Sequence, residues 1–233
     1  MGVALGSAMC MNFPETAETV LEDFREIGPS MIITSSRFWE DMASRIRVKI
    51  SDAGWLKKKL FYFGEKIGKS VVEKQSHKQP VPASLKALYK IMSVVVYRPL
   101  LDRLGCSRFR SAFTGGHPIS PDVIHFFRAI GLNLKQCYGL TESCGIFQIQ
   151  PDNEVKLETV GKPMSRSEVK IAEDQEVLVK SEANFSGYHN DYESTQNAFE
   201  NGWLKTGDAG YIDSDGHLLI IGRKEDIIRN KSG

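Results

Sequence analysis

The chain has 233 residues, of which 41% are hydrophobic and 25% are charged. This composition is typical of a folded globular protein and excludes a largely disordered chain. The formal net charge of +1 gives no electrostatic reason to expect nucleic acid as a partner. The average hides an asymmetry, because residues 37–90 contain 13 Lys and Arg against 5 Asp and Glu, and the rest of the chain is net acidic.

The sequence contains no clear disulfide, metal-binding or targeting pattern. The four cysteines form no CxxC pair and have no histidine at metal-ligand spacing, so neither a zinc site nor a disulfide framework is indicated. No apolar run approaches the roughly 20 residues that span a bilayer, and the first residues lack the basic start of a signal peptide. We therefore predict a cytoplasmic protein. Its basic region 37–90 is either a solvated surface or a peripheral contact with anionic lipid.

The first part of the chain predicts helices around one short strand. In chain order, the expected elements are a helix over 15–27, a strand over 31–33, a helix from about residue 36, a basic amphipathic helix over 55–74 and a loop over 75–82.

The segment 109–143 alternates between strand and helix patterns. We expect a buried strand over 109–113, a glycine-containing turn over 114–118, a helix that starts at Ser120-Pro121, a strand over 132–137 and a loop over 138–143. If the strands are parallel, the crossover is right-handed and both loops lie at the carboxyl edge of one sheet. Open α/β sheets bind their ligands at that edge.

From residue 155 the pattern changes to short alternating segments. Residues 169–171 are expected to pair with 177–179, and 211–212 with 218–221 around the turn Asp215-Gly216. The predicted organisation is an α/β subdomain over 1–154, a small β-rich lobe over 155–222, and a hinge with the start of a further subdomain over 223–233.

Four motifs carry a family resemblance. They are GGHP at 115–118, CYGLTES at 137–143, GWLKTGD at 202–208 and GRKED at 222–226. In this order they resemble the adenylate-forming ligases, which include acyl-CoA synthetases, luciferases and peptide-synthetase adenylation domains. The segments 12–30 and SRFWE at 36–40 look most like the long-chain fatty acyl-CoA synthetases.

The resemblance implies an α/β fold, namely part of the N-terminal region of such a ligase: a parallel sheet with flanking helices plus a small β-rich lobe. In the family a Ser/Thr/Gly/Lys-rich phosphate loop precedes these motifs, and a C-terminal subdomain with an assisting lysine follows them. No such loop is found before residue 12. We therefore expect a partial ligase that is inactive, or nearly so, by itself.

The resemblance also assigns roles to residues. Thr141 would donate to the α-phosphate of ATP, and Glu142 would hold Mg²⁺, a hard cation that prefers carboxylate and phosphate oxygens. Asp208 would bind the ribose hydroxyls, Arg223 the ribose or a phosphate, and Glu225 would be the hinge. The remaining nucleotide-binding candidates are Gly116, His117, Pro118, Gln136, Tyr138 and Gly139.

The predicted parent reaction joins a fatty acid to CoA with ATP and Mg²⁺, through a bound acyl adenylate. Two anions must meet in the first step, so catalysis depends on positioning and charge neutralisation. Two alternatives remain open. The carboxylate could be aromatic or of short or medium length, or the chain could bind nucleotide or acyl-AMP without catalysis.

Overall fold

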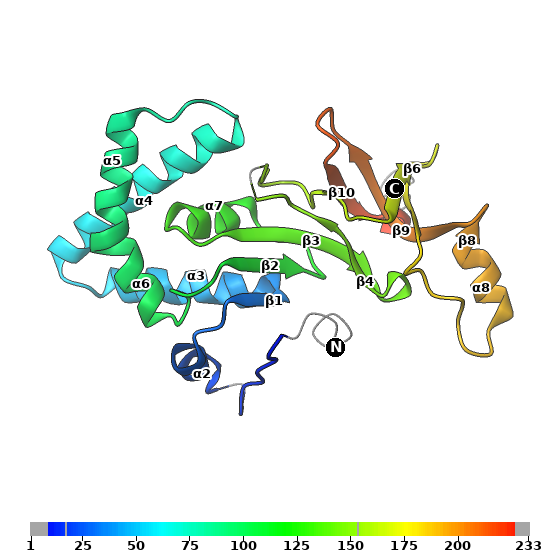
Figure 1. The fold of residues 1–233 in the computed structure, drawn as a ribbon, viewed down its shortest axis with the longest axis horizontal. Coiled ribbons are helices and arrows are strands. Elements are labelled where there is room, and N and C mark those ends of the chain that lie inside the picture. The colour runs from blue at the N-terminus through cyan, green and yellow to red at the C-terminus, as the bar shows by residue number, and fades with distance from the viewer. Residues whose placement is uncertain (1–8, 17, 153, 227–233) are drawn as a thin grey trace.

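The computed structural model describes residues 9–16, 18–152 and 154–226. Two five-stranded sheets form its two ends, and most helices surround the first sheet (Figure 1). The strands are β1 (Met31–Ser35), β2 (Ser111–Gly115), β3 (Leu134–Leu140), β4 (Gly145–Ile149), β5 (Lys162–Pro163), β6 (Ser167–Ile171), β7 (Glu176–Ser181), β8 (Phe199–Glu200), β9 (Trp203–Ile212) and β10 (Leu218–Arg223).

The helices lie mainly in the first half of the chain. They are α2 (Val20–Ile27), α3 (Ser36–Ser51), α4 (Trp55–Ser76), α5 (Ala83–Met92), the π-helical turn η1 (Ser93–Tyr97), α6 (Arg98–Arg103), α7 (Pro121–Ala129), the 3-10 turn η2 (Thr141–Ser143) and α8 (Tyr192–Ala198). Among the described residues, no helix has both the length and the apolar character needed to cross a bilayer.

Strands β1, β2 and β3 are parallel neighbours, so the condition set for the two strands around α7 in the sequence analysis is met. The connection from β2 to β3 is α7, which begins at Pro121 after Ser120. Proline suits this position because the first helical N–H has no partner within the helix. The loops after β2 and β3 therefore do leave the sheet at one carboxyl edge.

The helices pack in layers beside these strands. α3 presents Trp39, Met42 and Ile46 at helical spacing to a core that includes Phe126 and Phe127 of α7. α4 packs against α7 at Gly68, where an added Cβ would lie 2.1 Å from the Ala129 carbonyl oxygen. The glycine thus permits a close contact between two helix backbones.

A proline interrupts the helices after α5. Pro99 lies in the first turn of α6, and the five residues before α6 form the π-helical turn η1. Because proline lacks an N–H, it removes one helical hydrogen bond, and wider turns accommodate such interruptions. The apolar stretch that ends at Arg98-Pro99 therefore includes a π-helical turn between α5 and α6.

Element boundaries differ from the sequence predictions in several places, and three of them have a clear physical reason. The first helix begins at Val20, because the hydroxyls of Thr16 and Thr19 hydrogen-bond to nearby backbone and compete with the helix. β2 runs over 111–115, where its partner strands set the register. Residues 138–140, predicted as loop, continue β3 because they pair with β4, a strand that the sequence did not reveal.

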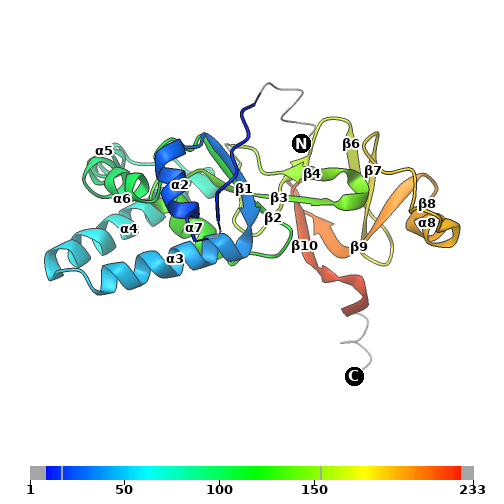
Figure 2. The ribbon, with the colours of Figure 1, turned by 90° about the horizontal axis from the view of Figure 1, so that it is seen from below.

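The second sheet has the order β10-β9-β7-β6, with β8 beside β9. Val169 pairs with Val179 and Ile171 with Val177, and β9 and β10 form the predicted hairpin. Phe147 of β4, Val179 and Leu204 of β9 form a buried cluster that joins the two sheets. Seen from below, this lobe, with α8 beside β8, and the helices α3 to α6 occupy opposite ends of the molecule (Figure 2).

The proposed domain division remains a prediction. The boundary after residue 154 falls between β4 and β5, and β5 still pairs with β4 in the first sheet. The predicted start of a further subdomain at 227–233 lies outside the described residues.

Candidate functional site

The end of β3 is held in a tight turn. An added Cβ at Gly139 would lie 1.8 Å from the Gly145 carbonyl oxygen, so glycine allows β4 to approach β3. The buried Ser143 hydroxyl donates to the Leu140 or Gly145 carbonyl oxygen and accepts from the Leu140 N–H. These contacts fix the turn η2, which exposes Thr141 and leaves Glu142 half-buried.

The motifs at 202–208 and 222–226 lie on the two strands of one hairpin. Antiparallel pairing places Arg223 directly opposite Asp208. Arg223 Nε lies 3.3 Å from Asp208 Oδ1, and its Nη1 donates to the Thr206 carbonyl oxygen at 3.2 Å. The two charged groups are thus neighbours because of strand register.

Tyr138 connects this hairpin to β3. Its hydroxyl donates to Asp208 Oδ2 at 2.5 Å, across 70 residues of sequence. The pKa of Tyr138 is raised above its usual value, mainly because the phenol is buried and secondly because it donates a hydrogen bond to the Asp208 carboxylate. The phenol therefore remains a donor at neutral pH. Asp208 is only 8% exposed, and its two oxygens have one contact each.

The hairpin is also tied to the turn between β6 and β7. Lys224 Nζ lies 2.5 Å from Asp174 Oδ2 and 2.7 Å from Glu176 Oε2. The hydrogen bond to Asp174 is the largest cause of the raised pKa of Lys224, and the hydrogen bond to Glu176 is the second. Glu176 also accepts from the Gly207 N–H at 3.0 Å. Glu176 was not predicted from the sequence. The alternation of residues along a strand does not indicate which acidic side chain accepts a hydrogen bond from a neighbouring strand.

Glu142 reaches a second segment of the lobe. Its Oε1 accepts from the Tyr188 hydroxyl at 2.9 Å, and its carbonyl oxygen accepts from the Phe185 N–H at 2.7 Å. The hydrogen bond to Glu142 raises the pKa of Tyr188. Tyr188 also lines an open cavity of about 670 Å³ formed by residues 186–192 with Thr195. The sequence gave no signal for Tyr188.

The remaining candidates are not bonded to this site within the part of the chain that the structure describes. Gly116, His117 and Pro118 follow β2 and are exposed, and Glu225 follows β10 and is exposed. Within the described residues no hydrogen bond or ion pair joins them to Tyr138, Glu142, Asp208 or Arg223. Gln136 is buried, and its amide nitrogen donates to the carbonyl oxygens of Leu157 and Thr159, 3.0 Å from each.

A buried polar network lies where the two sheets meet. The Gln150 side-chain oxygen accepts from the Gln136 N–H at 2.7 Å, and Thr159 Oγ1 lies 3.0 Å from His217 Nδ1. His217 is fully buried, and burial lowers its pKa against the opposing effect of Glu154. The family resemblance predicts Gln136 only as a nucleotide ligand, and no pattern in the sequence indicates this network.

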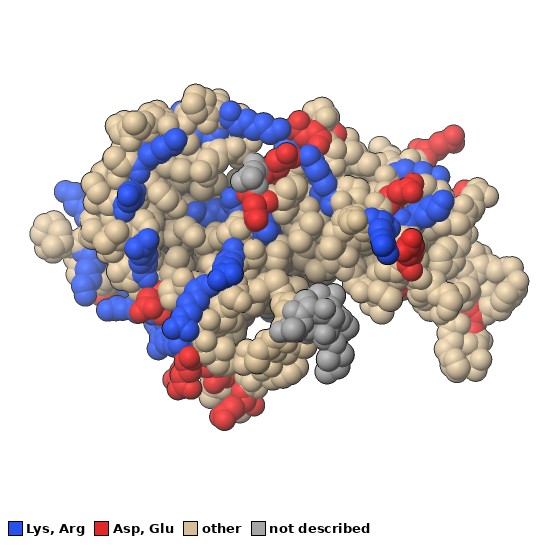
Figure 3. Space-filling model, in the orientation of Figure 1, with Lys and Arg blue, Asp and Glu red and all other residues tan. Residues whose placement is uncertain are grey.

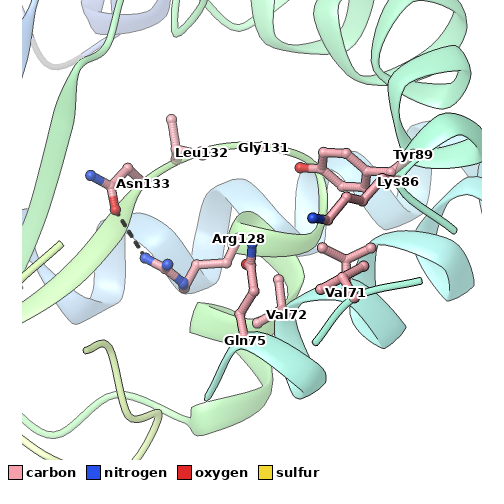
Figure 4. A pocket seen from close by; sticks show the side chains of 10 residues that line it. Val71, Val72, Gln75, Lys86, Tyr89, Arg128, Gly131, Leu132 and Asn133 are labelled. Carbon is pink, nitrogen blue, oxygen red and sulfur yellow. Dashed lines mark hydrogen bonds between the residues drawn. The ribbon is translucent and has the colours of Figure 1, made fainter. Parts of the chain in front are cut away.

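A second cavity, of about 340 Å³, lies among α4, α5, α7 and the residues that lead into β3 (Figure 4). Arg128 lines it and donates to the Asn133 side-chain oxygen at 3.0 Å. None of the predicted site residues lines this cavity, so it is separate from the cluster around Asp208.

A family profile described as AMP-binding enzyme matches residues 1–189. The chain belongs to the AMP-binding enzyme family.

Similar relatives of this AMP-binding chain include the long-chain-fatty-acid–CoA ligase FadD15 of Mycobacterium bovis, 33% identical over 99% of this chain and 38% of that protein. Long chain acyl-CoA synthetase 3 of Arabidopsis thaliana is 30% identical over 92% of this chain and 33% of that protein. The chain thus spans about two fifths, or less, of these relatives.

Solved structures show the same fold. The anthranilate CoA ligase AuaEII with anthranoyl-AMP has a TM-score of 0.61 at 18% identity, over 94% of this AMP-binding chain and 35% of that one. The o-succinylbenzoate CoA synthetase of Bacillus subtilis with ATP and magnesium has a TM-score of 0.58 at 21% identity, over 91% and 35%. The predicted α/β fold class, the N-terminal region of an adenylate-forming ligase, is confirmed, although the sheet is mixed because β4 and β5 are antiparallel.

Proposed function

We propose that this chain is the adenylate-holding part of a long-chain fatty-acid–CoA ligase. In the first step, a fatty-acid carboxylate oxygen bonds to the α-phosphorus of ATP, the bond to the β-phosphate oxygen breaks, and pyrophosphate leaves. In the second step, the CoA sulfur bonds to the acyl carbon, the bond from that carbon to the AMP phosphate oxygen breaks, AMP leaves, and the thiol proton passes to solvent. The relatives named as long-chain fatty-acid ligases, at 30% identity or more, support the choice of substrate.

Asp208 is the proposed ribose ligand. A buried carboxylate that accepts from Tyr138 has lone pairs left for both ribose hydroxyls. Arg223 lies beside it and neutralises its charge, with a guanidinium that can also reach a ribose or phosphate oxygen. The connection of Asp208 to both Tyr138 and Arg223 is the observation that carries the proposal, because it unites three of the four motifs.

Thr141 and Glu142 would face the phosphates. The Thr141 hydroxyl is exposed at the carboxyl edge and free to donate to an α-phosphate oxygen. Glu142 offers a carboxylate, and the described residues contain no cluster of three or more acids, histidines or cysteines. Mg²⁺ commonly takes one or two carboxylates together with substrate phosphates, so the donor set fits this ion. When bound, Mg²⁺ would neutralise charge on the phosphates.

Binding of a stable mimic of palmitoyl adenylate tests the proposal by calorimetry on this chain. Asp208→Asn should weaken binding at least about tenfold, because a hydrogen bond to a charged partner is worth about 1.5–3 kcal/mol. Asp102→Asn is the matched control, since Asp102 is an exposed acid on α6. Equal affinity of the Asp208 variant and the unaltered chain would refute the assigned role.

The acyl part and the activity are tested in the same preparation. Mimics with benzoyl or short acyl groups that bind better than the palmitoyl mimic would favour the other carboxylates. Incubation with palmitate, ATP, Mg²⁺ and CoA tests the expectation of little acyl-CoA from the chain alone. Robust formation of acyl-CoA would contradict that expectation while supporting the reaction itself.

A further inference from the structure

The turn between α3 and α4 lies at one extremity of the molecule. In two perpendicular views it is at the end opposite the lobe of β6–β10 (Figures 1 and 2). We call residues 47–66 the hairpin tip. It includes the last turn of α3 and the first three turns of α4.

The hairpin tip exposes large apolar side chains. They are Val48 (60% exposed), Trp55 (75%), Leu56 (62%), Tyr62 (52%) and Phe63 (49%). Trp55, Lys59, Tyr62 and Lys66 follow one another at spacings of three and four residues, so they share one face of α4. The opposite face is occupied, because Phe61, Gly64, Ile67 and Gly68 are buried. This exposed stripe therefore has no partner within the described chain.

The same surface is strongly basic. Five lysines lie on it, and among the described residues none of them forms an ion pair: Lys49, Lys57, Lys58, Lys59 and Lys66. The acids of the hairpin tip are Asp52 and Glu65, and Glu65 is paired with Lys69 at 2.8 Å. Lys and Arg side chains surround the helical end on the face shown in Figure 3.

Aromatic and aliphatic side chains interleaved with unpaired lysines match the boundary region of a bilayer. Trp and Tyr rings favour that region, and lysine stems can lie along apolar surface while the ammonium groups remain near anionic headgroups. A soluble protein partner would need complementary shape, but a bilayer needs only an apolar face with surrounding positive charge.

We propose that the hairpin tip docks this protein on the surface of an anionic lipid bilayer. Trp55, Leu56 and Phe63 enter the boundary between headgroups and acyl chains, and the lysines contact anionic headgroups. The nucleotide candidates lie on other elements, so the proposal is independent of the proposed ligase function. Vesicle binding without any nucleotide tests it separately.

The experiment uses phosphatidylcholine vesicles with and without phosphatidylglycerol. We expect sedimentation of the chain with anionic vesicles, weaker binding at higher salt, and little binding to phosphatidylcholine alone. Tryptophan emission should shift to shorter wavelength. The shift reports on Trp55, because Trp39 is fully buried and Trp203 is half-buried.

Two pairs of variants separate charge from apolar contact. The triple variant Lys57→Gln, Lys58→Gln and Lys59→Gln should bind anionic vesicles at least about tenfold more weakly. Its control, Lys86→Gln, Lys90→Gln and Arg98→Gln, removes the same charge from α5 and α6 and should bind normally. Trp55→Ala should abolish the emission shift and weaken vesicle binding. Tyr192→Ala removes a side chain that is also 75% exposed, and it should change neither the shift nor the binding.

Three other outcomes would overturn the proposal. Equal binding by both triple variants would show that overall charge, not the hairpin tip, attracts lipid. An emission shift that grows with protein concentration in the absence of vesicles would assign the surface to a second copy of the chain. Absence of binding to anionic vesicles would exclude lipid as the partner.

Discussion

The helical end and the junction between the two sheets are held together differently. The helical core is built from Trp39, Ile124, Phe126 and Phe127, all fully buried. The junction has the small apolar cluster of Phe147, Val179 and Leu204, but it also buries polar groups, namely the network of Gln136, Gln150, Thr159 and His217. Apolar packing is non-directional, whereas hydrogen bonds require particular distances and angles.

The difference explains where the candidate site lies. Tyr138 belongs to the first sheet and Asp208 to the second, so their contact requires the sheets to meet in one arrangement. A directional junction provides that arrangement, whereas an apolar interface alone tolerates several packings. We therefore expect substitutions in the helical core to reduce stability most, and substitutions at the junction to affect the site and its pH dependence.

The largest effect is expected in the helical core. Phe127→Ala should lower the free energy of unfolding by about 3–5 kcal/mol, because the ring is fully buried against Trp39 and its removal leaves a cavity. Urea denaturation followed by circular dichroism measures this. Val94→Ala, at a side chain 57% exposed, should change stability by less than about 0.5 kcal/mol. Similar losses of unfolding free energy in both variants would contradict the expectation that the helical core contributes most to stability.

Gly139→Ala should break the close approach of β3 and β4. The added methyl group has no room beside the Gly145 carbonyl oxygen, so we expect a loss of about 3 kcal/mol in unfolding free energy. Gly54→Ala is a suitable control, because nothing lies within 4 Å of its added Cβ and its φ is −59°. A stable Gly139 variant that keeps ligand affinity would show that the turn is not a rigid support.

Tyr138→Phe isolates the contact between the sheets. Loss of the hydroxyl removes the hydrogen bond to Asp208, and we expect a loss of about 1–2 kcal/mol in unfolding free energy. The affinity for the adenylate mimic should also decrease. Tyr211→Phe, at a half-exposed ring on β9, serves as the control for removal of a phenol hydroxyl. Unchanged stability would mean that the contact contributes little to the junction.

The smallest effect concerns pH. The folded state binds a proton on His217 less readily than the unfolded state, whose imidazole titrates near pH 6.5. The stabilising contribution is therefore complete above about pH 6.5 and is lost as the pH falls toward the lowered pKa. Urea denaturation at neutral and mildly acidic pH should show this loss, and His217→Gln should reduce the dependence. An unchanged dependence in the variant would remove His217 as its source.

Much of the fold could be predicted from local pattern. Ser120-Pro121 at the start of α7 and the hairpin around Asp215-Gly216 follow from the chemistry of a few consecutive residues. The extension of β3 to Leu140 was missed, because Tyr138 and Gly139 become strand only by pairing with β4. Strand propensity depends on partners that are not adjacent in sequence.

The sequence by itself determined which residues are predicted to carry nucleotide chemistry, since its four motifs name Thr141, Glu142, Asp208 and Arg223 through a family resemblance. Only the tertiary structure decided which of them meet. It placed Arg223 opposite Asp208, joined Tyr138 to Asp208, gave Glu142 a partner in Tyr188, and turned Gln136 toward the junction. The physical reason is that these contacts depend on strand register and on the packing of two sheets, and local sequence encodes neither.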